Sequence, residues 1–69
     1  MQNAKRIGNF IQKVAKEKDI SLKHIAETIS CTEREVWQFC NGEKWASYHQ
    51  LEKIASLLGV TMQQLLEGE

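Results

Sequence analysis

The chain has no proline, only four glycines and only two cysteines among its 69 residues. The lack of proline and the scarcity of glycine favour helices joined by short turns over strands and long loops. No apolar stretch approaches the roughly 20 residues that cross a bilayer. The polar residues at the N-terminus are not followed by the apolar segment that a signal peptide requires. We therefore expect one helical domain over residues 1–69, in the cytoplasm and with no membrane contact.

Residues that could carry out catalysis are also scarce. Cys31, Cys40, His24 and His49 lack the spacing of any recognised zinc site. The two cysteines are expected to be free thiols, buried or half-buried in a reducing compartment. There is no Gly-rich phosphate loop, and no cysteine–histidine spacing favours a nucleophile and its base. We expect no catalytic residue, metal, cofactor or small-molecule ligand, and no enzyme activity.

The chain has no excess of positive charge, since nine Lys and Arg balance nine Asp and Glu. The distribution is uneven, because the first 18 residues are basic. They contain Lys5, Arg6, Lys13, Lys16 and Lys18 against Glu17 alone. A solvated helix face explains such a pattern, and so does a flank that faces nucleic-acid phosphates.

Apolar residues recur at helical spacing along the whole chain. With the capping residues, they predict five helices at about 3–18, 22–29, 33–40, 48–58 and 62–66. Ser21 is the expected N-cap of the second helix. Three later helix starts have the spacing of a capping box, namely Thr32–Glu35, Ser47–Gln50 and Thr61–Gln64. Asn41-Gly42 and Gly59 are placed to end the third and fourth helices.

The stretch from Ser21 to Leu66 resembles the Cro and lambda-repressor type of helix-turn-helix domain. The matching segments are Ile25-Ala26, Thr32 through Val36, Asn41-Gly42, and Leu51-x-x-Ile54-Ala55-x-x-Leu58-Gly59-Val60-Thr61-x-x-x-Leu65-Leu66. The resemblance implies an all-α, compact five-helix, lambda-repressor-like domain whose second and third helices form the helix-turn-helix. It also implies sequence-specific binding of double-stranded DNA by a bacterial or phage transcriptional regulator, such as a repressor.

In this family the third helix enters the major groove of DNA. Carried over residue by residue, the base-reading positions fall on Glu33, Arg34 and Gln38, with Trp37 beside them. The positions that contact phosphates fall on Ser21, Lys23, Thr32, Asn41, Lys44, Ser47 and Tyr48. Arginine can donate two hydrogen bonds to guanine, glutamine can pair with adenine, and glutamate can accept from cytosine.

Several of these residues also have a purely structural explanation. Glu33 and Glu35 lie in the first turn of a helix, where carboxylates interact favourably with the helix dipole. The sequence departs from the family where Leu22 replaces a common Gln and where Trp37 replaces a small or polar residue. These departures, with the two carboxylates, leave an alternative open. The chain could be a protein-interaction module on the same fold, such as an antitoxin or anti-repressor, with weak or no DNA binding.

A domain of this size reaches only a few base pairs, and the family pairs two domains on one face of DNA. The short last helix carries more apolar residues than its own docking needs. We therefore expect a homodimer on DNA through Met62, Leu65 and Leu66, with at least one of the two leucines closing the core instead.

Overall fold

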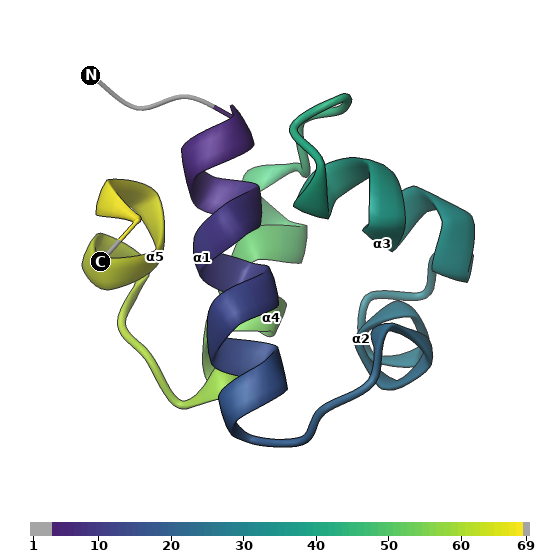
Figure 1. Ribbon diagram of the computed structural model, residues 1–69, viewed down its shortest axis with the longest axis horizontal. Coiled ribbons are helices and arrows are strands. Elements are labelled where there is room, and N and C mark those ends of the chain that lie inside the picture. Colours follow the sequence, from purple (N-terminus) through teal and green to yellow (C-terminus); the bar gives the residue numbers. More distant parts are fainter. Residues whose placement is uncertain (1–3, 69) are drawn as a thin grey trace.

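The computed structural model describes residues 4–68 and contains five α-helices in that range (Figure 1). They are α1 (Ala4–Glu17), α2 (Leu22–Thr28), α3 (Glu33–Cys40), α4 (Tyr48–Leu58) and α5 (Met62–Glu67). The all-α, five-helix architecture predicted from the sequence is confirmed. Each predicted helix end that falls within the described residues lies within one residue of the observed end. Asn3, the predicted start of the first helix, lies outside the described residues.

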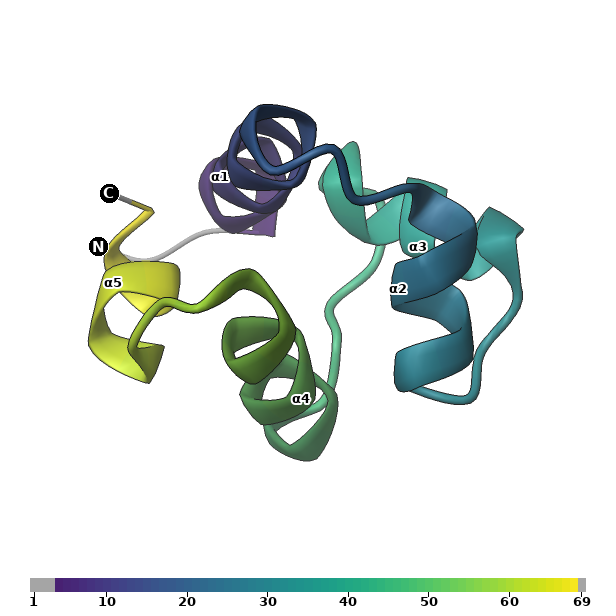
Figure 2. The ribbon, with the colours of Figure 1, turned by 90° about the horizontal axis from the view of Figure 1, so that it is seen from below.

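The first helix is central to the arrangement. α1 packs against α3, α4 and α5, while α2 packs against α3 and α4. Two perpendicular views place α2 and α3 together at one end of the molecule and α5 at the other end (Figures 1 and 2). The Cα atoms extend over 28 × 23 × 20 Å. The helix-turn-helix and the last helix are therefore separated along the length of the molecule.

One apolar core joins all five helices. Each helix contributes at least one almost fully buried side chain, and these include Ile11, Ile25, Val36, Leu58 and Leu65, each at most 1% exposed. No polar or charged residue is buried within residues 4–68. The core is therefore held by apolar burial alone, at about 25 cal/mol for each Å² removed from water.

Two glycines allow α1 to approach the C-terminal end of α3 very closely. A Cβ atom at Gly8 would lie 2.2 Å from the Phe39 carbonyl oxygen. At Gly42, whose φ is +74°, a Cβ atom would lie 2.5 Å from the Cα atom of Lys5. Any side chain at either position would push the two helices apart, so these glycines set the contact between α1 and α3.

The first four helices end in the same hydrogen-bonded motif. A residue in the left-handed conformation follows the helix, and the next N–H donates to a carbonyl five residues earlier. The left-handed residues are Asp19, Ser30, Gly42 and Gly59, with φ of 57°, 58°, 74° and 72°. Gly42 and Gly59 confirm the predicted helix ends, whereas Asp19 and Ser30 adopt this conformation despite their side chains.

Candidate DNA interface

The helix-turn-helix consists of α2, the turn over residues 29–32, and α3. The turn is fixed by the Cys31 N–H, which donates to the Ala26 carbonyl at 2.9 Å. Ile25 and Ala26 of α2 and Val36 and Phe39 of α3 are all buried in the shared core. Because this face of α3 packs inward, the opposite face points to solvent.

The predicted base-reading residues lie on this outer face. Glu33, Arg34 and Trp37 are exposed, and Gln38 is half-buried. Trp37 keeps 51% of its surface exposed. Within residues 4–68, the Arg34 guanidinium forms no hydrogen bond or ion pair. The structure thus leaves Glu33, Arg34 and Trp37 accessible to a ligand, and their role in reading bases stays a prediction.

Three of the predicted phosphate-contacting residues are N-caps. The Ser21, Thr32 and Ser47 hydroxyl oxygens each accept a hydrogen bond at 3.1 Å from the backbone N–H three residues later. Ser21 and Ser47 donate no side-chain hydrogen bond within the described chain, so their hydroxyl protons remain available to a phosphate oxygen. The Thr32 hydroxyl instead donates to Glu35 Oε1 at 3.4 Å.

The predicted capping box at Thr32 is wrong in one of its two halves. Glu35 N–H donates to Thr32 as expected, but no hydrogen bond from the Thr32 backbone to the Glu35 carboxylate is found within residues 4–68. Glu35 Oε2 instead lies 3.4 Å from Lys44 Nζ, so the carboxylate faces a cation nine residues away. The boxes at Ser47–Gln50 and Thr61–Gln64 are complete on both sides.

The other predicted phosphate contacts differ in how firmly they are held. Lys44 forms the ion pair with Glu35, which partly neutralises its charge. Asn41 Nδ2 donates to the Trp37 carbonyl at 3.0 Å, so this amide helps to end α3. Lys23 is exposed and forms no ion pair with any described residue. Tyr48 opens α4 with 64% of its surface exposed.

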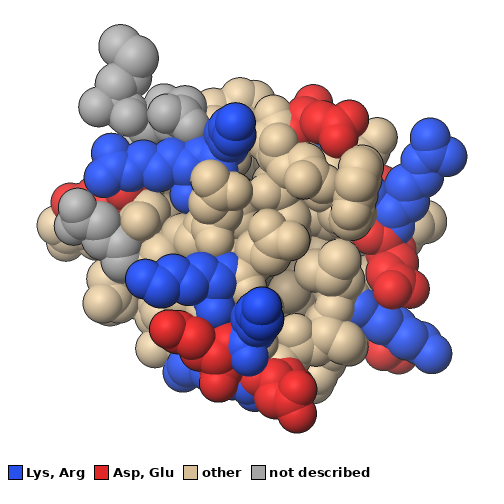
Figure 3. Space-filling model, viewed as in Figure 1, with Lys and Arg blue, Asp and Glu red and all other residues tan. Residues whose placement is uncertain are grey.

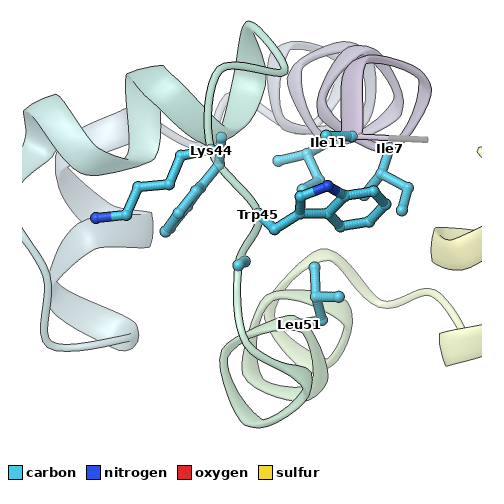
Figure 4. Close-up of a pocket in the computed structure, with 8 residues that line it drawn as sticks. Ile7, Ile11, Lys44, Trp45 and Leu51 are labelled. Carbon is cyan, nitrogen blue, oxygen red and sulfur yellow. The ribbon is translucent and has the colours of Figure 1, made fainter.

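The large exposed apolar side chains all fall between residues 37 and 48 in the described part of the sequence. Among residues 4–68 they are Trp37, Trp45 and Tyr48. The Trp45 indole lies across a narrow pocket beside Ile7 of α1 and Leu51 of α4 (Figure 4). Trp45 therefore has a packing role that the sequence did not reveal. Trp37 stands apart, on the outward face of α3.

Two of the basic residues in the first part of the chain, Arg6 and Lys18, lie beside the ends of other helices. Neither α3, α4 nor α5 has a basic residue in its last turn. A Cβ at Gly59, which ends α4, would lie 3.0 Å from Lys18 Nζ. A Cβ at Gly68, which ends α5, would lie 3.2 Å from Arg6 Nε. Arg6 of α1 and Lys18, which directly follows α1, thus place positive charge where the dipoles of α5 and α4 are negative.

Charges of both signs lie on the face seen in Figure 3. On the α1 side the basic side chains predominate, with acidic ones mostly toward the lower part of the view, while both signs occur at the end formed by α2 and α3 (Figure 3). α3 itself carries Glu33 and Glu35 against Arg34. A ligand at α3 therefore meets a mixed polar and aromatic surface rather than a strongly basic one.

Both thiols are free, and their surroundings keep them protonated. Burial raises the pKa of Cys40 to about 11. Partial burial raises the pKa of Cys31, with Glu35 adding to the effect. The Cys31 sulfur also accepts a hydrogen bond at 2.9 Å from Gln50 Nε2. In the described part of the chain, no cluster of three His, Cys, Asp or Glu residues is placed to hold a metal ion. No helix there is long and apolar enough to cross a membrane.

The last helix corrects one predicted interface residue. Leu65 is 0% exposed and belongs to the core, so it cannot also contact a partner. Met62 and Leu66 are half-buried, as are the neighbouring Leu57 and Val60. Among the described residues of α4, α5 and the turn between them, these four side chains leave part of their apolar surface exposed.

Comparison with known proteins agrees with this geometry. A family model for the Cro/C1-type helix-turn-helix DNA-binding domain matches residues 11–69. The chain belongs to this family. No curated protein sequence matches it.

Solved structures of other Cro/C1-type proteins share the fold. SinR, a master regulator of biofilm formation solved in complex with DNA, is 30% identical, with a TM-score of 0.77 over 87% of this chain and 97% of SinR. The P22 c2 repressor, solved with a synthetic operator, is 17% identical with a TM-score of 0.83 over 100% of both chains. The restriction-modification controller protein C.AhdI from Aeromonas hydrophila is 18% identical, with a TM-score of 0.81 over 90% of this chain and 94% of that protein.

Proposed function

We propose that the protein binds double-stranded DNA in a sequence-specific manner by inserting α3 into the major groove, and that it regulates transcription. The observation that carries the proposal is the accessible face of α3, with Glu33, Arg34 and Trp37 exposed on a Cro/C1-type helix-turn-helix. SinR and the P22 c2 repressor, solved with DNA, support it by similarity. A DNA regulator of a bacterial cell acts in the cytoplasm, and we place the protein there.

The polar groups on α3 suit particular bases. The free Arg34 guanidinium can donate two hydrogen bonds to the O6 and N7 atoms of guanine. The Glu33 carboxylate accepts from the N4 amino group of cytosine, and it repels phosphates, so a misplaced α3 is disfavoured. Gln38 is half-buried, and its exposed part could pair with adenine.

Contacts with the DNA backbone rely on few free charges. Lys23 is the unpaired cation of the predicted phosphate set, while Lys44 must leave Glu35 before it meets a phosphate. The Ser21 and Ser47 hydroxyl groups, with Tyr48, supply neutral donors. Since each neutralised phosphate adds about 0.9 to the slope of log K against log salt, we expect a shallow salt dependence.

We propose that two copies pair through the exposed parts of Met62 and Leu66, with Leu57 and Val60 beside them. α5 and α3 lie at opposite ends of a molecule 28 Å long. Two copies joined at α5 therefore have the reach to place their α3 helices in successive major grooves, about 34–36 Å apart.

The proposal is one of binding and not of catalysis. A cysteine nucleophile acts as a thiolate, which a low pKa favours. The pKa values of both Cys31 and Cys40 are raised. Arg34 and Glu33, the accessible charged residues of α3, have the chemistry of base recognition instead.

The test is selection of duplexes from a random DNA pool with the purified protein, followed by affinity measurements over a salt series. We expect a consensus with two related half-sites. Arg34→Ala should lower affinity for it about 5- to 150-fold and relax one base position. Glu52→Ala, on the exposed side of α4, is the matched control and should leave affinity unchanged. Recovery of no consensus would contradict the proposed function.

A further inference from the structure

The outer face of α3 combines a large apolar ring with a shortage of positive charge. Trp37 leaves 51% of its surface in contact with water, although tryptophan gains strongly from burial. Glu33 precedes it by four residues, which places the two side chains one helical turn apart on the same side of α3. The part of the ligand that meets Trp37 must therefore be apolar, and its neighbour must donate hydrogen bonds to a carboxylate.

The charge of α3 favours phosphate binding too little to supply the affinity on its own. The net charge of α3 is negative by one, since Arg34 opposes Glu33 and Glu35, and Lys44 is engaged by Glu35. Attraction to phosphates therefore contributes less here than in a basic recognition helix. Affinity must come from the base edges, where hydrogen bonds and apolar contacts are made.

The major groove presents one apolar group, the methyl group on carbon 5 of a pyrimidine. Thymine always carries it, and 5-methylcytosine carries the same group next to an N4 amino donor. We propose that Trp37 reads a pyrimidine 5-methyl group, which makes it a specificity-determining residue of the recognition helix. This inference rests on the proposed function, because it requires α3 to lie in the major groove.

The other exposed tryptophan does not compete for this role. Trp45 lies against Ile7 and Leu51 across the pocket between α1 and α4 (Figure 4). Trp45 keeps 56% of its surface exposed, but one side of its indole lines this pocket and the residue lies in the loop before α4, outside α3. Trp45 therefore supplies a matched control of the same residue type.

The experiment removes single methyl groups from the DNA without changing its base pairing. In the duplex selected by the intact protein, each thymine is replaced in turn by deoxyuridine, and affinity is measured by fluorescence anisotropy. We expect one position in each half-site where this replacement lowers affinity about three- to five-fold, as burial of one methyl group predicts. Trp37→Ala should bind more weakly and lose this discrimination, while Trp45→Phe should keep it.

Two further arms identify the source of the methyl group. Cytosine and then 5-methylcytosine are placed at the sensitive position, and 5-methylcytosine should restore binding relative to cytosine if Glu33 accepts from its N4 amino group. If thymine alone restores binding, the natural ligand is thymine.

The outcomes separate this inference from the function on which it rests. If a consensus is selected and no deoxyuridine replacement changes affinity, the inference about Trp37 is wrong while DNA binding stands. The same conclusion follows if the sensitivity persists unchanged in Trp37→Ala. If no consensus is selected at all, the proposed function fails, and the reading of methyl groups fails with it.

Discussion

In the helix pairs α2–α3 and α4–α5, a serine or threonine hydroxyl caps the start of each helix. The two pairs differ in how many of the backbone and side-chain groups at the helix ends form hydrogen bonds within the chain. In α4–α5, both capping boxes are complete and both helices end at glycine in the left-handed conformation. In α2–α3, neither start has a complete box, and α2 ends at Ser30 with φ of 58°. Natural proteins depart from such local rules mainly at functional sites, and of these two helix pairs it is the helix-turn-helix that departs. Asp19, at the end of α1, is a similar departure outside both pairs.

The largest expected effect on stability in either helix pair comes from removing Leu65, the buried leucine through which α5 packs on the core. We expect Leu65→Ala to lower the free energy of unfolding by roughly 2–5 kcal/mol, because it opens a cavity in the only core of a small domain. Leu66→Ala, which removes a half-buried side chain, is the matched control and should cost clearly less. Thermal melts followed by circular dichroism measure both. Equal losses would show that Leu65 is not the residue that closes the core.

The two thiols provide a second contrast through pH. The pKa of buried Cys40 is raised from 9.0 to about 11, so the folded state favours the neutral thiol. This contribution to stability is complete below pH 9 and is lost as pH rises through about 11. At pH 10 the intact protein should have lost roughly 1.4 kcal/mol more than Cys40→Ala, relative to pH 7. Urea unfolding at both pH values is the measurement, and parallel losses in the two proteins would contradict the assignment.

Stability should respond differently to loss of Gln64 and of Glu35, which lie three residues after the N-caps of α5 and α3. Thr61→Ala and Thr32→Ala should each cost about 1 kcal/mol, because each removes an acceptor for a backbone N–H. Gln64→Ala should add a further loss at α5, since its side chain accepts the Thr61 N–H at 2.9 Å. Glu35→Ala should cost less than Gln64→Ala, because Glu35 accepts no such bond. Urea unfolding of the four variants would contradict this if Glu35→Ala proved the more damaging.

Replacing Ser30 by glycine would give α2 the same left-handed glycine that ends α4. Ser30→Gly is expected to raise stability by about 0.5–1 kcal/mol, since the left-handed conformation is unfavourable for a residue with a Cβ. Asp19→Gly at the end of α1, with nearly the same φ, should gain less, because aspartate tolerates this conformation better. A lowered melting temperature for Ser30→Gly would mean that the serine side chain stabilises the turn.

The smallest expected effect is on DNA affinity and comes from the ion pair between Glu35 and Lys44. Glu35→Gln should release Lys44 to meet a phosphate, and it removes a carboxylate near the DNA. We expect affinity for the selected duplex to rise about two- to five-fold, in line with the value of an exposed ion pair. The salt slope should steepen by about 0.9 for each domain bound. Adding Lys44→Gln to Glu35→Gln should reverse the change in slope, and a slope that ignored both substitutions would show that Lys44 meets no phosphate.

Local sequence rules predicted the five helices and their ends, because the spacing of apolar residues and the hydroxyl caps act within a few residues. The same rules could not choose between Leu65 and Leu66, since both are apolar neighbours and only the docking angle of α5 buries one of them fully. They also could not foresee that Glu35 turns to Lys44, because that contact depends on the path of the loop after α3.

The candidate site was predicted to a similar extent. The sequence placed Glu33, Arg34 and Trp37 on one helix, and the exposure of all three follows from the burial of Val36 and Phe39 on its other side. The packing of Trp45 against α1 and α4 was not predictable, because residues 43–46 have no regular structure whose periodicity would reveal a direction.

The close approach at Gly8 means that α1 fixes the position of α3. The Phe39 and Cys40 carbonyls rest against the backbone of α1, so the tilt of α3 follows from the position of a helix that reaches no base. A shift at Gly8 would displace the C-terminal end of α3 and change the tilt of the helix, and with it the direction in which Glu33, Arg34 and Trp37 point. If α3 binds DNA as proposed, a new operator preference can therefore arise by two routes, one through the exposed side chains of α3 and the other through the position of α1, which sets the tilt of α3.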